Sequence, residues 1–432
     1  MISSSAPFES DGAVGNLGYV TAPSSSRRSP LRCHVNTENT PRILTLSCAF
    51  PNPAQPGLGS FVRSRMQAVA SVAEVKVVAP VAHLAYSRIG KTQAGGNDIP
   101  YWRSDGRLEV LHPRWFYPPW GMALNAFLLA GQVWLPLVRL QKRFPFQVID
   151  SHFGFPDGIA ASVLASVFGV PFVVTLRGNE PMHARSPLVR WLLRRALRNA
   201  AQVITVSERL RDFAVQLGVS PSNVRTIPNG IDTDVFHTRD RLESRRKWGI
   251  SPHEKVILSA GALIERKGHH RIVKALSALK HTGVSARLLI AGAAGPEGQY
   301  EGRIHQAVTD AGLQNNVQFV GYITQGEMAE LMSAADVLCL ASSREGWPNV
   351  VHESLGCGTP VVATDIGGVP EMVPGDCYGF VVPAADQKAL EIALRQALEK
   401  DWDRNAISAW GRSRSWATVA QEMLDIFNNA VH

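Results

Sequence analysis

The sequence predicts an α/β protein made of two doubly wound halves. Two series of short apolar stretches, each of strand length, alternate with stretches of helical periodicity. Such alternation is typical of parallel sheets covered by helices on both faces. A turn signal and a polar, charged stretch separate the two series between residues 228 and 252. A chain of 432 residues is also too long for one ordinary core, so two domains are expected.

The expected strands are apolar runs bounded by turn signals. The first series is PRILTLSCAFP, VAEVKVVAP, FQVIDSHF, PFVVTLRG and AQVITVS, and the second is KVILSAG, ARLLIAG, VQFVG, DVLCLAS and TPVVATD. In open sheets of this type ligands bind beyond the carboxyl ends of the strands. For two such domains we therefore expect the site in the cleft between them.

Composition and hydrophobic patterning divide the chain into five expected segments. Residues 1–40 are rich in Ser, Gly, Pro and Asn and lack apolar periodicity, which predicts a disordered tail. Residues 41–228 would form the N-terminal domain and residues 253–405 the C-terminal domain, joined by a linker at 229–252. Residues 406–432 would form a C-terminal helix that could pack back on the N-terminal domain.

Composition narrows the class of protein. The five cysteines are odd in number and scattered without a CxxC pair, so neither a disulfide framework nor a structural zinc site is expected. No metal site is expected elsewhere. The net charge of +8 favours anionic partners. No signal-peptide core is visible, so we expect a cytoplasmic protein.

Two stretches raise the question of a membrane. Trp115 to Val138 contains no charged residue and is long enough to span a bilayer. Asn125, Gln132 and Pro136 interrupt it, so a buried or interfacial helix is the better expectation.

The second stretch is a basic helix, ARSPLVRWLLRRALRNA, with no acidic residue. Arg190, Arg194 and Arg198 share one face, with Arg195 beside them, and like charges at this spacing repel. An anionic membrane surface or a lipid-diphosphate acceptor would relieve that repulsion. Together with the aromatic run at 115–120, this suggests a peripheral enzyme on the inner membrane face. The alternative is a solvated surface helix.

The stretch REGWPNVVHESLGCG places two glutamates around a predicted helix start. Pro348 suits the first helical position, and the helix would run to about Leu355. Its N-terminal amides could bind an anion such as a diphosphate. Glu345 in the loop and Glu353 in the helix could then hold vicinal hydroxyls at opposite ends of one ligand. Alternatively, one glutamate caps the helix and the other is solvated.

Two glutamates separated by seven residues, followed by TPVVATDIGGVPE, resemble the signature of retaining glycosyltransferases of family 4. Further segments match that family in order: the Gly57–Gly59 loop, SHFGFPDG, VSERL, IPNGIDTDVF, GALIERKG, LLIAGAAGPEG, VQFVGY and SAADVLCLAS. The resemblance covers roughly residues 41 to 400. It implies the GT-B fold, in which two Rossmann-like domains face each other across a cleft.

The resemblance also implies roles for individual residues. Glu353 would bind the ribose hydroxyls of a nucleotide. Glu345 would contact the hydroxyls of the transferred sugar and stabilise positive charge as the glycosidic bond opens. Lys267 would neutralise the departing diphosphate. Other implied donor contacts come from backbone amides and close approach: Gly57, Gly59, Gly346, Trp347, Pro348, Asn349 and Val350.

The sequence departs from the family pattern at two positions. Ala262 stands where the family usually has an arginine directed at the diphosphate, and Arg266 could partly substitute for it. Arg177 replaces a frequent histidine. It could meet an anionic group of the donor or acceptor, or be an ordinary surface arginine.

Three more residues are candidates for the cleft. His152 and Asp157 lie at the end of the strand FQVIDSHF, in the segment SHFGFPDG, and each has a structural alternative; Asp157 could merely cap the next helix. Asn229 is first a turn residue, with Asn-Gly supplying a positive φ, and contact with the donor is secondary.

The implied function is retaining transfer of a hexose-type sugar from a UDP-, GDP- or ADP-sugar to a glycan or lipid-linked acceptor. Cell-surface polysaccharide or glycolipid synthesis would be its setting, with no cofactor and no nucleic-acid partner. A non-catalytic nucleotide-sugar-binding subunit and a sugar-nucleotide epimerase are the alternatives. A nicotinamide dehydrogenase is disfavoured because GLGSFV places Val62 at the third glycine position.

Overall fold

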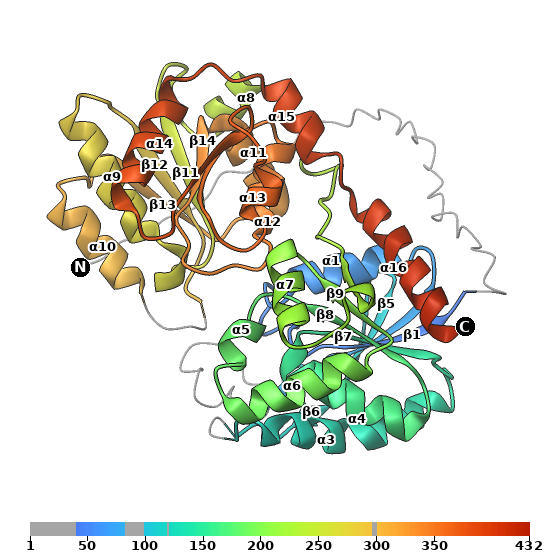
Figure 1. Ribbon diagram of the computed structural model, residues 1–432. Helices are drawn as coiled ribbons and strands as arrows, with labels where there is room; N and C mark the ends of the chain where they lie inside the picture. Colours follow the sequence, from blue (N-terminus) through green and yellow to red (C-terminus); the bar gives the residue numbers. More distant parts are fainter. Residues whose placement is uncertain (1–39, 83–98, 119–120, 296–299) are drawn as a thin grey trace, which may run out of the picture. The chain divides into compact units, whose positions relative to one another are not determined.

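A computed structural model describes residues 40–82, 99–118, 121–295 and 300–432 (Figure 1). These residues belong to one compact unit, Thr37–His432. The expected disordered tail at 1–40 lies, apart from its last residue, outside the described residues.

The first sheet has eight strands in the order β10-β9-β8-β7-β1-β2-β5-β4, all parallel except β4, which runs antiparallel to β5. Its strands are β1 (Arg42–Leu46), β2 (Glu74–Val78), β4 (Trp102–Asp105), β5 (Leu108–Leu111), β7 (Val148–His152), β8 (Phe172–Leu176), β9 (Gln202–Thr205) and β10 (Val224–Thr226).

The second sheet has six parallel strands in the order β13-β12-β11-β14-β15-β16. They are β11 (Val256–Ala260), β12 (Arg287–Ala291), β13 (Val317–Gly321), β14 (Val337–Leu340), β15 (Val361–Thr364) and β16 (Gly379–Val382). A separate pair joins β3 (Val81–Ala82) to β6 (Arg114–Trp115). The predicted class, two α/β domains with parallel sheets, is confirmed.

Every predicted strand is present, but the short strands β3, β4, β5, β6, β10 and β16 were not anticipated. Each has only two to four residues, and β4 and β10 form the edges of the first sheet. Edge strands alternate exposed and buried positions, so they lack the continuous apolar run that marks a buried parallel strand.

Fifteen α-helices, described within the ranges above, surround the sheets. In the first half they are α1 (Ser60–Val69), α3 (Leu124–Gln141), α4 (Ile159–Phe168), α5 (Glu180–His183), α6 (Pro187–Asn199) and α7 (Glu208–Gln216). The others are α8 (Arg241–Lys247), α9 (His269–His281), α10 (Glu301–Asp310), α11 (Gln325–Ala334), α12 (Asn349–Gly356), α13 (Val369–Met372), α14 (Gln387–Glu399), α15 (Arg404–Gly411) and α16 (Trp416–Val431).

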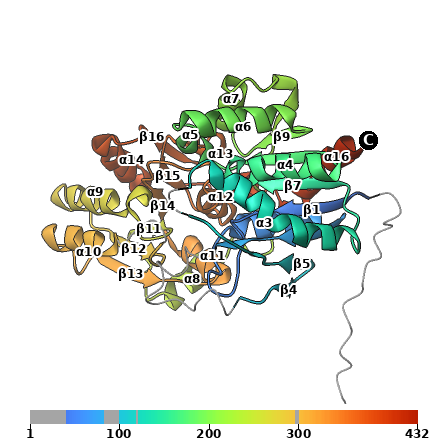
Figure 2. The same cartoon turned by 90° about the horizontal axis from the view of Figure 1, so that it is seen from below.

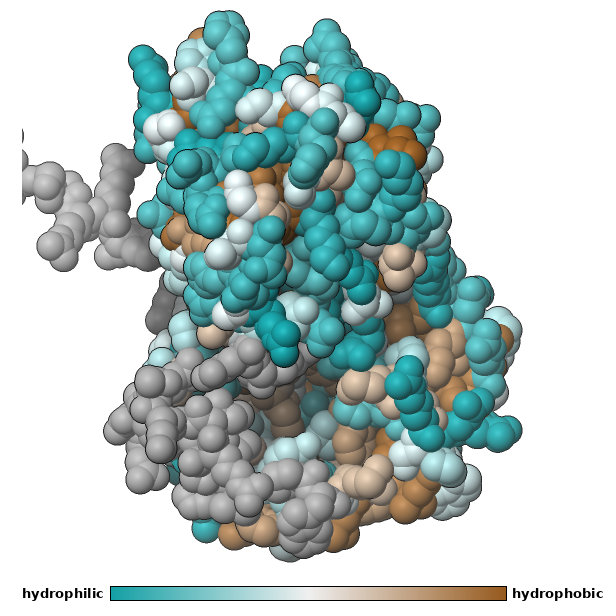
Figure 3. Space-filling view, turned by 90° about the vertical axis from the view of Figure 1, so that its left-hand side faces the viewer, coloured by the Kyte–Doolittle hydropathy of each residue, from teal (hydrophilic) through white to brown (hydrophobic). Residues whose placement is uncertain are grey.

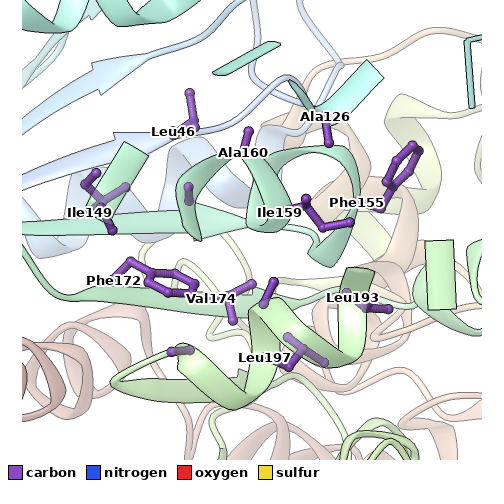
Figure 4. Packing of buried hydrophobic residues seen from close by; sticks show 14 of the residues in the cluster. Leu46, Ala126, Ile149, Phe155, Ile159, Ala160, Phe172, Val174, Leu193 and Leu197 are labelled. Atoms are coloured by element: carbon purple, nitrogen blue, oxygen red, sulfur yellow. The ribbon is translucent and has the colours of Figure 1, made fainter. Parts of the chain in front are cut away.

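The first sheet is buried on both faces, because successive side chains of its strands enter different cores. Leu46, Phe172 and Val174 pack with α3, α4 and α6 (Figure 4). Ile43 and Val173 point to the opposite face, where they pack with α1 and α16. Burial on both faces explains why the strands of this sheet are continuous apolar runs in the sequence.

Helix α16 comes last in the chain but packs on α1 and on the first sheet. The chain leaves this domain through Ile227–Asn229 and returns beside it, since Ile231 N donates to Arg414 O and Trp416 N donates to Ile231 O, both at 3.2 Å. Buried Arg65 holds the segment that leaves the domain by donating to Ile227 O at 2.8 Å. The two segments that connect the domains therefore lie side by side.

Helix α8 lies within the segment expected to be a linker, where it packs against α11. Arg245 is buried and donates to Ala334 O at 3.0 Å and to Asp336 Oδ2 at 2.9 Å. The charged run RDRLESRRK is therefore part of the folded domain. Its buried Arg245 exchanges hydrogen bonds to water for hydrogen bonds to protein acceptors.

The uncharged run Trp115 to Val138 forms β6 and most of α3. Among the described residues, no helix combines the length and hydrophobicity needed to cross a bilayer. Buried Asn125 donates to Pro118 O at 3.1 Å, so its amide has a partner inside the protein.

Truncating Phe427 tests the packing of α16. Phe427 is fully buried against the first sheet, so Phe427→Ala should destabilise the fold by about 3–5 kcal/mol and lower the Tm by on the order of 10 °C. The exposed neighbour Asp425 provides the control, Asp425→Ala. Equal Tm values for the two variants, measured by circular dichroism, would contradict the packing described.

Candidate active site

The loop after β14 holds a carboxylate that two cations share. Glu345 Oε1 accepts from Lys267 Nζ at 2.6 Å, from Ser342 Oγ at 3.0 Å and from Arg266 Nη1 at 3.3 Å. Lys267 and Arg266 follow β11, which is paired with β14, so the loops at the carboxyl ends of these strands are neighbours. The structure thus brings three of the predicted site residues together.

The second cation of this cluster is Arg266. Arg266 points to the same carboxylate as Lys267, as substitution for a missing family arginine would require. Ala262 has no charged side chain that could contact a diphosphate. Its carbonyl oxygen lies 3.2 Å from His269 Nε2. Two cations therefore remain beside Glu345, both from the ERKG segment.

Glycine backbones hold the Glu345–Trp347 segment on two sides. A Cβ on Gly346 would lie 1.9 Å from Arg177 O, and one on Gly178, whose φ is +119°, would lie 2.7 Å from Gly346 Cα. On the other side, a Cβ on Gly367 would lie 2.4 Å from Glu345 O. Larger residues would force these backbones apart, so glycine is required for the observed loop position.

Helix α12 begins directly after this loop. Pro348 is its N-cap, with φ −75° and ψ 95°, and the first helical residue is Asn349. The expectation that Pro348 occupies the first helical position is therefore wrong by one residue. The reason is that the ψ of Pro348 is extended and not helical, so this residue flanks the helix and does not belong to its first turn. The amides of Asn349 and Val350 still belong to the first turn, where no residue four positions earlier can accept from them.

Glu353 lies farther along α12 and is half-buried. No described residue gives its carboxylate a hydrogen bond or an ion pair, and burial raises its pKa to about 7. A desolvated carboxylate without a partner is costly, and such groups are concentrated at sites that bind ligands.

A second polar cluster surrounds Arg177, which is buried and is not a surface arginine. Arg177 Nη1 donates to Asn229 Oδ1 at 2.7 Å, and Asn229 Nδ2 donates to Asn349 Oδ1 at 2.9 Å. This chain connects the end of β8 to the first residue of α12. The Arg177 guanidinium also lies over the ring of Phe61, 5.1 Å from its centroid.

His152 completes this cluster. Its Nδ1 lies 2.8 Å from Arg177 Nη2, and its Nε2 lies 3.1 Å from Asp150 Oδ2 without hydrogen-bond geometry. Burial lowers the pKa of His152 to about 4, so the ring is neutral at pH 7 and can accept from Arg177. Asn229 is buried as well, and neither Asn229 nor Gly230 has a positive φ. The expected Asn-Gly turn geometry is therefore wrong, because the Asn229 side chain is used in this cluster.

Asp157 acts on the first loop. Its Oδ1 accepts from the backbone amide of Cys48 at 2.9 Å, and burial raises its pKa to about 7. Gly59 in this loop has φ +62°, and a Cβ there would lie 2.0 Å from Ala49 O, so the loop itself requires glycine. A Cβ on Gly57 would meet no atom within 4 Å, so packing within the protein does not explain that glycine.

Glu180 was not predicted from the sequence. It is buried at the start of α5 and accepts from three backbone amides, those of Gly154 at 3.1 Å, Arg177 at 3.0 Å and Gly178 at 2.7 Å. Glu180 therefore fixes the loop that touches Gly346. One glutamate after RGN forms no recognisable pattern, because its partners are backbone groups.

The remaining predicted residues are at the surface. Arg190, Arg194, Arg195 and Arg198 are exposed on α6. In the described part of the chain, no three His, Cys, Asp or Glu side chains are grouped so that they could hold a metal ion.

Comparison with known proteins places the chain in a family. Residues 240–414 match the model of the "Glycosyl transferases group 1", and residues 75–235 match that of "Glycosyltransferase Family 4". The 2-deoxystreptamine glucosyltransferase of Streptomyces kanamyceticus is 30% identical over 292 residues, which are 61% of this chain and 72% of that protein. The chain belongs to the group 1 glycosyltransferases of family 4.

Solved structures agree on the fold of this glycosyltransferase. Sucrose-phosphate synthase from Thermosynechococcus elongatus superimposes with a TM-score of 0.72 at 20% identity, over 88% of this chain and 97% of that one. Anabaena HepE, solved in complex with UDP and glucose, has a TM-score of 0.67 at 21% identity, over 89% and 98%. The predicted family and the GT-B fold are confirmed, as is its class as a transferase.

Because the pKa of Glu353 is raised, we expect the free energy of unfolding to depend on pH. Its pKa of about 7 in the folded protein exceeds the ordinary value of 4.5, so the folded state binds this proton more tightly than the unfolded state. The free energy of unfolding should fall as the pH rises from 4.5 to 7 and stay low above it. Glu353→Gln should remove that loss and be more stable than wild type at pH 8 by about 1–3 kcal/mol.

Urea unfolding of the unliganded protein at pH 5 and pH 8 measures this difference. Glu399→Gln, at a site on α14 that is 56% exposed, is the control and should retain the wild-type pH dependence. If Glu353→Gln also retains it, the carboxyl group is not desolvated as described.

Proposed function

We propose that this glycosyltransferase transfers a hexose-type sugar, with retention of anomeric configuration, from a nucleotide-diphosphate sugar to a glycan or lipid-linked acceptor. The observation that carries this proposal is the cation pair on Glu345 next to the N-terminus of α12, with the unpaired Glu353 on the same helix. These groups match the chemistry of a diphosphate and of two sets of sugar hydroxyls.

At the diphosphate, Lys267 and Arg266 would act together with the amides at the start of α12. In this structure the Glu345 carboxylate contacts both Lys267 and Arg266. A diphosphate can take over these donors, and the helix N-terminus adds amide dipoles directed at the same charge. The glycine contacts fix the loop beforehand, so little reorganisation is needed when charge develops.

At the hydroxyls, the two carboxylates would have different tasks. Glu353 would accept from the ribose, since it is desolvated and lacks a partner in the protein. Glu345, released from its cations by the donor phosphates, would accept from the transferred sugar. When the bond from sugar to phosphate breaks, its electron pair stays with the diphosphate, and the negative Glu345 stabilises the oxocarbenium-like sugar.

The polar cluster of Arg177 supports a role at the reacting sugar. Arg177 is linked through Asn229 to Asn349, the first residue of α12, so the N-terminal domain supplies a positive group next to the donor helix. We assign Arg177, His152 and Asn229 to the acceptor side of the site, and Asp157 to support of the first loop.

UDP is the first nucleotide to test, because the structurally similar HepE was solved with UDP and glucose. GDP- and ADP-sugars remain alternatives, since that similarity concerns the fold. We further propose cell-surface polysaccharide or glycolipid synthesis at the cytoplasmic face of the membrane as the setting. No cofactor or metal is part of the proposed reaction.

Donor screening combined with Lys267→Ala tests the proposal. One class of UDP-, GDP- or ADP-sugar should raise the wild-type Tm when held well above its Kd. With that donor, Lys267→Ala should lower kcat/KM for transfer or donor hydrolysis about tenfold to a hundredfold, because a charge-assisted bond to the leaving diphosphate is lost.

The control is Lys274→Ala, an exposed position on α9, which should leave kcat/KM within twofold of wild type. Glu345→Gln separates catalysis from binding: transfer should fall while the donor-induced Tm shift remains. No response to any of the three donor classes, or equal activity of Lys267→Ala and wild type, would refute the proposal.

A further inference from the structure

The outer surface of α3 is apolar although it faces water. Leu124, Phe127, Trp134 and Leu135 are each 42–52% exposed. They recur at helical spacing on the side opposite to the buried stripe of this helix, and the only charged residue of α3 is Arg139 in its last turn. An amphipathic surface helix would carry polar residues on that side, so this exposed stripe needs a partner.

The neighbouring helices extend the same face. Helix α3 packs against α4, and α4 packs against α6, as Figures 1 and 2 also show. Val167 on α4 is 59% exposed, and Trp191 and Leu188 on α6 are 58% and 56% exposed. Figure 3 shows hydrophobic residues gathered on the lower part of its view, at the height at which Figure 1 draws these helices. We call the outer sides of α3, α4 and α6 the three-helix face.

The exposed charges on this part of the chain are all positive. Between Val110 and Ser207 the sequence contains ten Lys and Arg but three acidic residues. The three acids, Asp150, Asp157 and Glu180, are all buried, whereas nine of the ten cations are not; Arg177 is the exception. Exposed cations stand at two edges of the three-helix face: Arg139, Lys142 and Arg143 at the end of α3, and Arg190, Arg194, Arg195 and Arg198 on α6.

We propose that the three-helix face binds an anionic lipid bilayer. Trp, Phe and Leu side chains would enter the boundary between head groups and acyl chains, and the arginines and lysines around them would pair with lipid phosphates. Without an exposed carboxylate, nothing on this stretch repels an anionic surface. Trp191 lies on the exposed side of α6 together with Arg195 and Arg198, which combines both chemistries on one helix.

This inference deepens the proposed transfer to a lipid-linked acceptor, on which it rests for its biological sense. It places the domain that carries Arg177 and His152 on the lipid surface. Its test measures binding and not transfer, so the two proposals can fail independently.

Co-sedimentation with vesicles is the test. The full chain should sediment with vesicles of phosphatidylcholine containing about 30% phosphatidylglycerol, less at raised NaCl, and weakly with phosphatidylcholine alone. Phe127→Ser combined with Trp134→Ser should weaken binding to the mixed vesicles at least about tenfold. Arg195→Gln combined with Arg198→Gln should weaken it by about 30-fold, since each cation near the surface contributes about fivefold.

The matched control lies on the other domain. Lys388→Gln with Ile392→Ser changes an exposed cation and an exposed apolar side chain of α14, which are 79% and 49% exposed, and should bind like wild type. Circular dichroism and Tm confirm that each variant is folded; if the apolar variant is not, the arginine variant still decides. Absence of wild-type binding, or losses equal to the control, would overturn the proposal. So would a wild-type dimer in sedimentation velocity that only Phe127→Ser with Trp134→Ser dissociates, since the face would then join two copies of the chain.

Discussion

The position of one loop, Glu345–Trp347, determines what the rest of the site can do. Backbone atoms of Arg177 and Gly178 approach it from one side and Gly367 from the other, at distances that exclude any Cβ. Glu180 in turn fixes Arg177 and Gly178 by accepting from both of their amides. The carboxylate of Glu345 is thereby held beside Lys267 and Arg266, and α12 starts at a defined place.

This arrangement explains why charges of opposite sign coexist without donor. Lys267 and Arg266 would repel each other if Glu345 were absent, and Glu345 would be a desolvated anion without them. In the proposed complex, a diphosphate would replace Glu345 as the anionic partner of the two cations. Glu353 behaves differently, because no described residue donates to its carboxylate and burial alone raises its pKa to about 7.

The sequence predicted the parts of the fold that depend on local patterns. Buried parallel strands, α12 and the glutamate pair were visible, because apolar runs and fixed spacings are local features. The residues that connect distant loops were not. Glu180 bonds to backbone amides, Asn229 was assigned to a turn, and Arg177 could equally have been a surface residue. Their functions arise from neighbours that the fold brings together, as between Asn229 and Asn349, 120 positions apart. The apolar stripe of α3 was expected to be buried or interfacial, and only the exposure of Phe127 and Trp134 distinguishes these alternatives.

A crystal structure of the protein with UDP, or with the nucleotide diphosphate that the donor screen selects, would show whether the residues of the candidate site bind the donor. We expect diphosphate oxygens within hydrogen-bond distance of Lys267 Nζ and of the first amides of α12. We also expect ribose hydroxyls within hydrogen-bond distance of Glu353, and Glu345 separated from Lys267. A nucleotide bound elsewhere, with the pair of Lys267 and Glu345 intact at 2.6 Å and Glu353 still without a partner, would contradict this expectation.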